Sequence, residues 1–362
     1  MLKDAMEKVL FDPEELKPVG FMPPPLPGMP PTPIFNSPIS SKENFWRLTK
    51  GEDPLWMPHT KEFMVFTPSC IPDCWARGSV SKPGPPIPPE EYGGKDMFGV
   101  EWEYVKSVHG SMVRPGAPMV PDLEHWEDYV SFPDIEKWDW AGSADDKAKL
   151  CCHQGAIVKV VFFTGLFERL ISFVGMTEAL IGMIDEDAKP AIHRLFDRLC
   201  ILYDSIFAKI KQYFDADIIW FHDDWGSQRA PFFSLDTVNE MITPYLKRCV
   251  ESVHRHGMAF ELHCCGKVEI LVPAMIEAGC DMWNGQPIND KKKVLQQYGD
   301  KIICDSSPDP LPPDATKAQK VENIRRYLQE FKGLRTYCRM NYDSPEDEYE
   351  LLYEESRKFF CS

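Results

Sequence analysis

The feature that most constrains the fold is a regular alternation of strand and helix patterns from about residue 155 to the end of the chain. Apolar, β-branched runs are followed by segments whose apolar residues recur at helical intervals. The strands are predicted at 156–165, 216–224, 258–265, 280–285, 301–307 and 334–340, and the helices at 166–176, 186–214, 234–257, 269–279, 291–298, 315–331 and 346–360. Six successive β/α units predict a parallel sheet, which right-handed crossovers close into a barrel or wind into an open sheet. Because no G-x-G-x-x-G motif follows an early strand, we expect an α/β fold of the (β/α)8 TIM-barrel type.

A second feature, proline, predicts an extension before the barrel. The chain has 33 prolines, and ten of them lie between Pro13 and Pro38. Helix interiors and central strands exclude such runs, because each proline ring fixes φ and removes a hydrogen-bond donor. The same stretch contains apolar residues such as Phe21 and Phe35, so we expect it to pack across a surface or a cavity mouth. We therefore predict a Pro-rich arm over 1–40 and a single barrel domain over 41–362, beginning with a helix at 41–51 that a capping box opens.

Charge and composition exclude several classes of partner. The formal net charge is −16, and a field of that sign opposes nucleic acid and anionic lipid surfaces. No apolar run approaches the length of a membrane span, and the amino-terminal residues carry no signal or transit pattern. We therefore predict a cytoplasmic protein without a nucleic-acid or membrane partner. The 12 cysteines show no disulfide framework and are expected to be reduced thiols, some of which bind metal.

In a TIM barrel the reacting groups lie at the carboxyl ends of the strands, and here those ends are polar. His222, Asp223 and Asp224 end the strand predicted at 216–224. Two adjacent carboxylates there can bind a hydroxyl, accept a proton or orient a metal-bound group. The structural alternative is that the aspartates cap a helix or a loop. Asn284 and Gln286 follow a later strand and are candidate substrate-binding residues.

The strand predicted at 258–265 carries a candidate zinc site. Side chains two positions apart share a face of a strand, so Glu261, His263 and Cys265 point together, while Cys264 points to the other side. Imidazole and thiolate are ligands that zinc prefers, and three protein ligands leave one position open for catalysis. A third ligand could come from Cys304 or Cys338 at the ends of two later strands. The alternative is that these are buried structural thiols and a hydrogen-bonded core histidine.

The run DDWGSQRAPFFSLDTVNEMITPYLKRCVESVHRHGMAFELHCCGKVEILVPAMIEAGCDMWNGQPIND resembles the uroporphyrinogen-decarboxylase superfamily, in the branch of corrinoid-dependent methyltransferases. ENFWRLTKGEDPLWMP, FGVEWE and PDLEHWEDYVSFPDIEKWDW are also similar to that branch, in particular to its O-demethylase methyltransferases, so the resemblance covers roughly residues 41–360. It implies the barrel fold already inferred.

The resemblance also implies a ligand set. In zinc-dependent members a His-x-Cys and a later cysteine hold the metal, which corresponds to His263, Cys265 and Cys338. Cys338 lies in TYCRMNYD rather than in the glycine-rich loop of those members, so Cys304 is a substitute. A second pattern, associated with ether-cleaving members, corresponds to Asp236, Cys264 and Cys304. Strand parity favours the set that contains His263.

The activity that the resemblance implies is zinc-dependent transfer of a methyl group from a phenyl methyl ether to the cobalt(I) of a corrinoid. No Asp-x-His-x-x-Gly motif is present, so a partner protein is expected to carry the corrinoid. Asp224, with Asp223 or His222, would position the substrate or supply a proton, and Glu261, Asn284 and Gln286 would bind the substrate. Three alternatives stay open: methylation of a thiol by methylcobalamin, a metal-free decarboxylase, which the lack of an arginine-rich opening disfavours, and a non-catalytic zinc or corrinoid-binding module. A homodimer is also left open.

Overall fold

The computed structural model describes residues 10–22, 31–108, 110–114, 116, 118–150, 155–340 and 346–361. Residues 1–9 and 23–30 of the predicted arm lie outside the described residues. The chain divides into two compact units: unit 1 comprises residues 1–64, 151–157 and 292–362, and unit 2 comprises residues 65–150 and 158–291. The predicted boundary at residue 40 stays a prediction.

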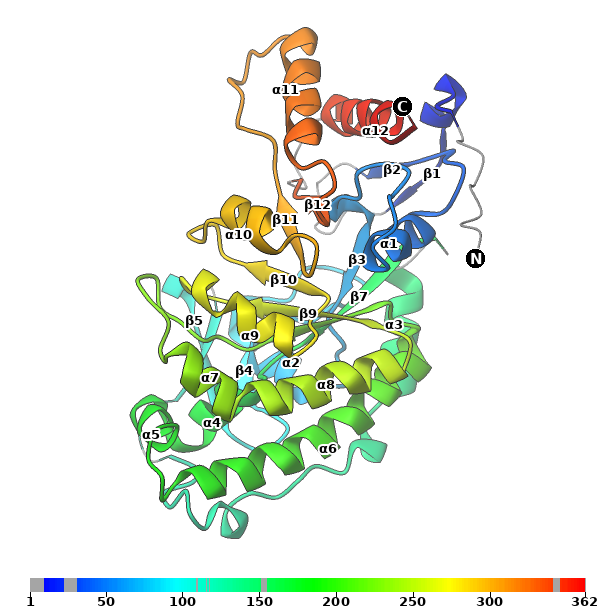
Figure 1. The fold of residues 1–362 in the computed structure, drawn as a ribbon. Coiled ribbons are helices and arrows are strands. Elements are labelled where there is room, and N and C mark those ends of the chain that lie inside the picture. Colours follow the sequence, from blue (N-terminus) through cyan, green and yellow to red (C-terminus); the bar gives the residue numbers. More distant parts are fainter. Residues whose placement is uncertain are drawn as a thin grey trace. The chain divides into compact units, whose positions relative to one another are not determined.

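Unit 2 contains a parallel sheet whose strands alternate with helices, coloured green to yellow in Figure 1. Its parallel strands are β7 (Ile157–Phe162), β8 (Ile218–His222), β9 (Ala259–Cys264) and β10 (Met282–Gly285). Its helices are α2 (Pro72–Ala76), α3 (Trp140–Leu150), α4 (Leu166–Val174), α5 (Met176–Gly182), α6 (Lys189–Phe214), α7 (Leu235–Met241), α8 (Thr243–Arg255) and α9 (Val272–Glu277). A second, antiparallel sheet is formed by β4 (Gly93–Lys95), β5 (Glu101–Val105) and β6 (Gly110–Val113).

The core of unit 2 forms where the sequence pattern predicts it. All six residues of β7 are buried, as the apolar run indicates. Helix α6 buries the face that carries Leu195, Leu199 and Ile206, so the helix predicted near 186–214 is confirmed. The helix predicted at 234–257 is divided into α7 and α8 at Ile242, because Pro244 removes a backbone donor and stands in the first turn of α8.

Unit 1 combines amino-terminal and carboxyl-terminal segments. Its elements are β1 (Pro18–Met22), β2 (Thr32–Phe35), α1 (Ser41–Thr49), β11 (Ile303–Ser306), α11 (Lys317–Glu330), β12 (Thr336–Cys338) and α12 (Glu346–Cys361). Helix α10 (Lys291–Tyr298) and strand β3 (Phe63–Phe66) span divisions between the units, as does β7, whose first residue is assigned to unit 1. Short 3-10 helices of the chain are η1 (Pro13–Leu16), η2 (Thr60–Glu62), η3 (Pro89–Glu91), η4 (Lys106–Val108), η5 (Trp126–Asp128), η6 (Ile135–Lys137) and η7 (Glu269–Leu271). The Ser40 side chain accepts a hydrogen bond from Glu43 N at 3.1 Å, which confirms the predicted start of α1.

The described part of the arm packs against α12, as its apolar residues predict. Phe35 is buried and stacks on Tyr349, with ring centroids 4.7 Å apart. Glu15 accepts hydrogen bonds from the Arg357 guanidinium, with Nε to Oε2 at 2.7 Å, and from Tyr353 Oη at 2.7 Å. These contacts bury a paired charge beneath an aromatic cluster, so Glu15 and Phe35 of the arm belong to the core of unit 1.

The expected closure into an eight-stranded barrel is not confirmed. The main sheet has seven strands in the order β12-β11-β10-β9-β8-β7-β3, so in the described chain it ends at β12 and at β3. Beyond β12 a single parallel bridge joins Cys338 to His59, with Cys338 N donating to Pro58 O at 2.7 Å. Pro58 has no N–H with which to continue a ladder, which is a physical reason for the gap. The class is α/β with parallel strands in a TIM-like order, and the barrel is open.

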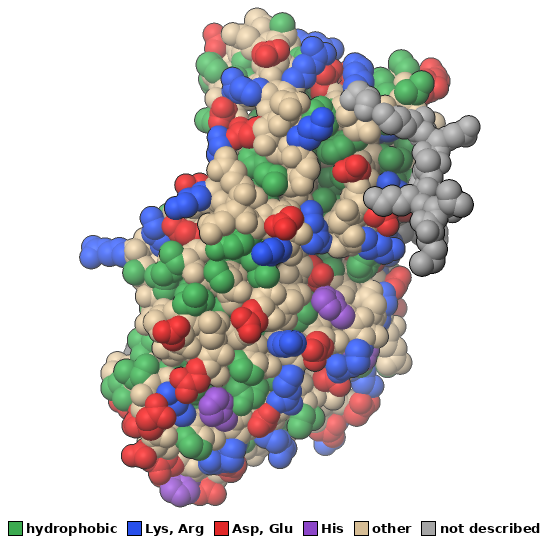
Figure 2. All heavy atoms as spheres, viewed as in Figure 1, with side chains coloured by type: hydrophobic (Ala, Val, Ile, Leu, Met, Phe, Trp, Pro, Cys, Tyr) green, Lys and Arg blue, Asp and Glu red, His purple; other side chains and the backbone are tan. Residues whose placement is uncertain are grey.

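The surface carries charges of both signs. On the face drawn in Figure 2, acidic and basic side chains are interspersed rather than segregated. Among the described residues no helix combines the length and the apolar character that crossing a bilayer requires.

Candidate metal centre

The candidate site lies in unit 2, where β8 and β9 end side by side. The two strands are parallel, and His222 is the register partner of His263. The backbone continues the pairing, because Asp223 N donates to His263 O at 3.0 Å. The carboxyl ends of parallel strands meet at one edge of a sheet. The loop after β8 and the loop after β9 therefore adjoin.

Three half-buried side chains, one from the end of β9 and two from these loops, can hold a metal ion. Asp224, His263 and Cys265 each offer one ligand atom, and these atoms all lie within 4.8 Å of one another. His263 Nε2 lies 3.3 Å from Cys265 Sγ, and Cys265 N donates to Asp224 Oδ1 at 2.7 Å. The structure thus brings together two predicted zinc ligands and one predicted catalytic carboxylate.

Two side chains that were predicted to bind substrate lie directly behind these groups. Asn284, at the register position of His263 on β10, places its Oδ1 2.9 Å from His263 Nδ1. Because the Asn284 oxygen accepts a hydrogen bond, it favours a proton on Nδ1, and the lone pair of Nε2 is then available to a metal. Metal-binding histidines commonly donate a hydrogen bond from the ring nitrogen that does not bind the metal. Gln286 donates from Nε2 to Cys265 Sγ at 3.4 Å and accepts from Gly266 N at 2.9 Å. Both residues orient the candidate ligands.

The donor set fits zinc. Around tetrahedral zinc an imidazole nitrogen and a thiolate sulfur are about 3.5 Å apart, close to the separation of His263 Nε2 and Cys265 Sγ. Burial, reinforced by the charge of Asp224, raises the pKa of Cys265. A thiol in that environment needs a nearby cation to ionise, and a coordinated metal supplies that charge. Zinc would be held by Asp224, His263 and Cys265, with the fourth position open.

Two glycines permit the close approach of the loops. Gly266 has φ +95°, and a Cβ there would lie 2.4 Å from Gly226 O. Any side chain at Gly266 would therefore collide with backbone as well as strain the left-handed conformation. This fit keeps Cys265 beside Asp224.

Asp223 and His222 occupy different environments from Asp224. The Asp223 carboxylate accepts from Phe167 N, Glu168 N and Trp225 Nε1 at 3.2, 2.9 and 2.8 Å, so it binds the amino-terminal turn of α4. Burial raises its pKa to about 6. The His222 ring packs on His263, with centroids 4.4 Å apart, and burial lowers its pKa. Their predicted catalytic roles stay predictions.

Glu261 lies two residues before His263 on β9 and is fully buried. It forms an ion pair with Lys159 of β7, whose ammonium lies 5.1 Å from the centroid of the Trp220 ring. A buried charge without a partner is strongly destabilising, so the Glu261 carboxylate and the Lys159 ammonium each depend on the other at this depth. The structure therefore places Glu261 in an internal pair, and its predicted contact with substrate stays a prediction.

The remaining candidate ligands are distributed over both units. Cys264 points away from His263, as strand parity predicts, and its Sγ accepts from Trp225 N at 3.2 Å. Asp236 is exposed in the first turn of α7. Cys304 and Cys338 are buried in unit 1, on β11 and β12. Their participation in the site of unit 2 stays a prediction.

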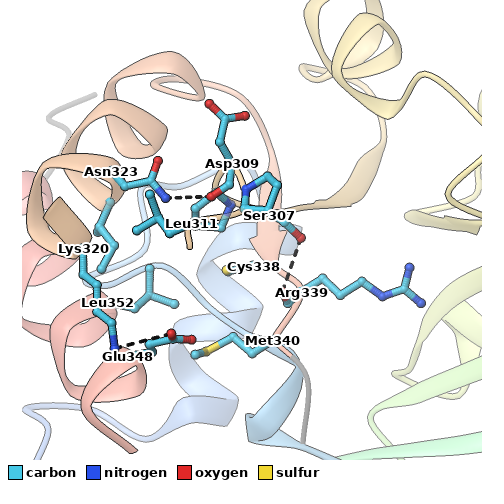
Figure 3. A pocket seen from close by; sticks show the side chains of 13 residues that line it. Ser307, Asp309, Leu311, Lys320, Asn323, Cys338, Arg339, Met340, Glu348 and Leu352 are labelled. Atoms are coloured by element: carbon cyan, nitrogen blue, oxygen red, sulfur yellow. Dashed lines mark hydrogen bonds and ion pairs between the residues drawn. The ribbon is translucent and has the colours of Figure 1, made fainter. Parts of the chain in front are cut away.

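Cys338 borders a separate hollow within unit 1. The cavity has a volume of about 290 Å³, and Figure 3 shows Cys338 between Ser307 and Met340 in its wall. Burial raises the pKa of the Cys338 thiol to about 12, so the thiol is neutral at physiological pH. Lys320, which also lines this cavity, is already paired with Asp347 at 2.8 Å.

A larger cavity borders the candidate metal centre in unit 2. Its volume is about 760 Å³, and Asp224 forms part of its wall. Most of the lining is apolar and includes Trp102, Met112, Val113, Met119, Ile171 and Phe232. Such a volume and lining are typical of sites for small organic ligands.

Sequence reasoning missed the charged pair in this cavity wall. Arg77, the C-cap residue of α2, donates from Nη1 and Nη2 to Glu168 Oε1, both at 3.0 Å. The Arg77 guanidinium also lies 5.0 Å from the centroid of the Trp102 ring. Glu168 and Arg169 are the two charged residues inside the otherwise apolar helix pattern of 166–176, and nothing in the sequence pairs Glu168 with Arg77.

The buried Glu168 carboxyl predicts a specific pH dependence of stability. Burial raises its pKa from 4.5 to about 8, against the opposing charge of Arg77. Between these values the folded chain keeps a proton that the unfolded chain has released, so this group lowers the free energy of unfolding as pH rises. We expect the unfolding free energy of Glu168→Gln, relative to the unmodified protein, to increase from pH 5 to pH 8 in urea titrations. Glu127→Gln, in an exposed pair with Arg194, is the control, and a flat difference for Glu168→Gln would contradict the assignment.

Comparison with solved structures shows that the fold is similar to that of a methyltransferase. A solved structure described as a methyltransferase from Methanosarcina mazei matches with a TM-score of 0.58 and 15% sequence identity, over 89% of this chain and 99% of that one. At this identity the likeness establishes a shared fold. Neither the models of protein families nor the curated proteins gave a match.

Other solved structures share less of the fold. A sugar phosphate isomerase/epimerase from Parabacteroides distasonis matches with a TM-score of 0.32 and 10% identity, over 65% of this chain and 82% of that one. A D-psicose 3-epimerase from Clostridium cellulolyticum matches with a TM-score of 0.33 and 11% identity, over 59% of this chain and 81% of that one. These similarities are too distant to carry an argument about function.

Proposed function

We propose that the protein is a zinc-dependent methyltransferase that moves a methyl group from a phenyl methyl ether to the cobalt(I) of a corrinoid carried by a partner protein. The observation that carries the proposal is a carboxylate, an imidazole and a thiol held together at the edge of an apolar cavity of about 760 Å³. The fold likeness to the Methanosarcina mazei methyltransferase and the sequence resemblance to corrinoid-dependent methyltransferases support it.

The chemical difficulty is the departure of the ether oxygen. A phenol has a pKa near 10, so phenolate is a poor leaving group at neutral pH. Asp224, His263 and Cys265 would hold the zinc, which would supply Lewis acidity for the negative charge that develops on this oxygen. The C–O electron pair stays with the oxygen, and the methyl group forms its new bond with the electron pair of cobalt(I).

The chain's own residues hold and orient these groups. Asn284 fixes the His263 ring through Nδ1, and Gln286 donates a hydrogen bond to the Cys265 sulfur. Trp102 and Phe232 offer flat apolar walls for an aromatic ring and exclude water from it. The proposed transfer requires the cavity mouth to admit the partner's corrinoid, since the methyl acceptor must approach in line with the breaking C–O bond.

The test is methyl transfer with purified components. The protein is incubated with a reduced corrinoid protein and a series of methoxyarenes, and formation of methylcobalt is followed by absorbance. We expect transfer with the metal-loaded protein, at least about a hundredfold loss after chelation, and recovery on addition of zinc. Turnover of a methoxyarene without any corrinoid, or equal rates before and after verified zinc removal, would overturn the proposal.

A further inference from the structure

The carboxyl group of Glu168 is an unusual component of the cavity wall. The residue is 8% exposed and lines the cavity together with Asp224. Its Oε1 accepts both hydrogen bonds from Arg77, whereas its Oε2 has no hydrogen-bond partner in the described part of the chain. A buried oxygen without a hydrogen-bond partner destabilises the folded protein, because it has lost its contacts with water. A ligand that completes its hydrogen bonding would offset that loss.

The charges around the cavity select against an anionic ligand. Both arginines that line it are already paired: Arg77 with Glu168, and Arg114 with Glu103 at 2.6 Å between Nε and Oε1. Asp224 and Glu101 add further negative charge to the wall. A carboxylate on the ligand would therefore meet acidic groups and would find each guanidinium engaged. An uncharged ligand avoids this repulsion.

We propose that Glu168, held in place by Arg77, binds a hydroxyl group of an uncharged phenolic ligand, so that the substrates are methoxyphenols without a carboxylate. This inference rests on the proposed function and specifies its substrate class. A hydroxyl group is both donor and acceptor, so it can pair with the carboxyl in either protonation state. The pair with Arg77 fixes the carboxyl, which makes Glu168 a substrate-binding residue and Arg77 a positioning residue.

Binding without corrinoid tests the inference on the unmodified protein. Isothermal titration calorimetry compares 2-methoxyphenol with anisole, which lacks the hydroxyl, and with 2-methoxybenzoate, which replaces the hydroxyl by a carboxylate. We expect 2-methoxyphenol to bind at least about tenfold more tightly than either of the others, because a site built for a hydroxyl rejects analogues without it. Equal binding of anisole, tighter binding of the benzoate, or no binding of any of the three overturns the inference.

Variants then assign the selectivity to Glu168. In Glu168→Ala the ratio of 2-methoxyphenol affinity to anisole affinity is expected to fall to about one, while Glu127→Ala, which breaks a surface pair with Arg194, keeps the ratio of the unmodified protein. An unchanged ratio in folded Glu168→Ala would refute the role of this residue. If Glu168→Ala does not fold, the three-ligand comparison on the unmodified protein decides.

The outcome separates this inference from the proposed function. Glu168-dependent binding of 2-methoxyphenol without methyl transfer to a corrinoid would retain the binding site and reject the methyltransferase. Methyl transfer from anisole and 2-methoxyphenol with equal affinities would retain the methyltransferase and reject the phenol specificity.

Discussion

Replacement of His263 by alanine is expected to remove zinc from the purified protein and to abolish methyl transfer. His263 contributes the nitrogen ligand, and its loss should weaken zinc binding by more than the roughly 10- to 100-fold that loss of an outer hydrogen-bond partner costs. Asn284→Ala removes such an outer partner, so an intermediate loss is expected there. Zinc affinity is measured by competition with a chromogenic chelator.

A histidine elsewhere in unit 2 provides the control. His254 pairs with Asp281 at 2.7 Å and is 42% exposed, so His254→Ala should leave the zinc affinity unchanged. If His263→Ala retained zinc with the affinity of the unmodified protein, the metal centre would have to lie elsewhere. The same assay distinguishes the third ligand. We expect loss of zinc in Asp224→Asn, whereas loss only in Cys338→Ser or Cys304→Ser would favour the ligand set implied by the family resemblance.

Replacement of Arg169 by methionine is expected to have the largest effect on stability. Arg169 of α4 is fully buried and pairs with Asp73 of α2 and with Asp96, whose Oδ2 lies 2.6 Å from Nη1. Without the guanidinium two carboxylates stay buried near each other, so we expect the free energy of unfolding to fall by about 3–5 kcal/mol. Urea denaturation followed by circular dichroism measures this change.

The matched control is an arginine pair on the surface of the same unit. Arg194 and Glu127 are both about half exposed, and Arg194→Met should cost less than about 1 kcal/mol. If Arg169→Met also lowered the free energy of unfolding by less than about 1 kcal/mol, the buried cluster of Arg169, Asp73 and Asp96 would not be a major source of stability. The cluster also affects the cavity: Asp96 accepts a hydrogen bond from Trp102 Nε1 at 3.0 Å, so Arg169→Met should weaken ligand binding as well.

Regular periodicity explains why the secondary structure was predictable in the second half of the chain. Apolar residues at helical spacing put α6 and α11 close to their predicted ranges, and the β-branched run of 156–165 is β7. These signals are local, because each depends on neighbours along the chain. Closure of a barrel depends on pairing between strands distant in sequence, and Pro58 beside the short strand β12 illustrates how that pairing ends.

The candidate site also combines features that local sequence determines with features that only long-range packing determines. The two-residue spacing of His263 and Cys265 on one strand determines by itself that both side chains share a face, because alternation is a property of extended backbone. Only the tertiary structure decided that Asp224 completes the group, since the parallel register of β8 and β9 brings it there from 39 residues away in the sequence. Likewise, the pairing of Arg77 with Glu168 joins α2 to α4, and its burial sets the pKa of the carboxyl. Side-chain spacing within one element is local geometry, whereas a site assembled from several elements is fixed by packing.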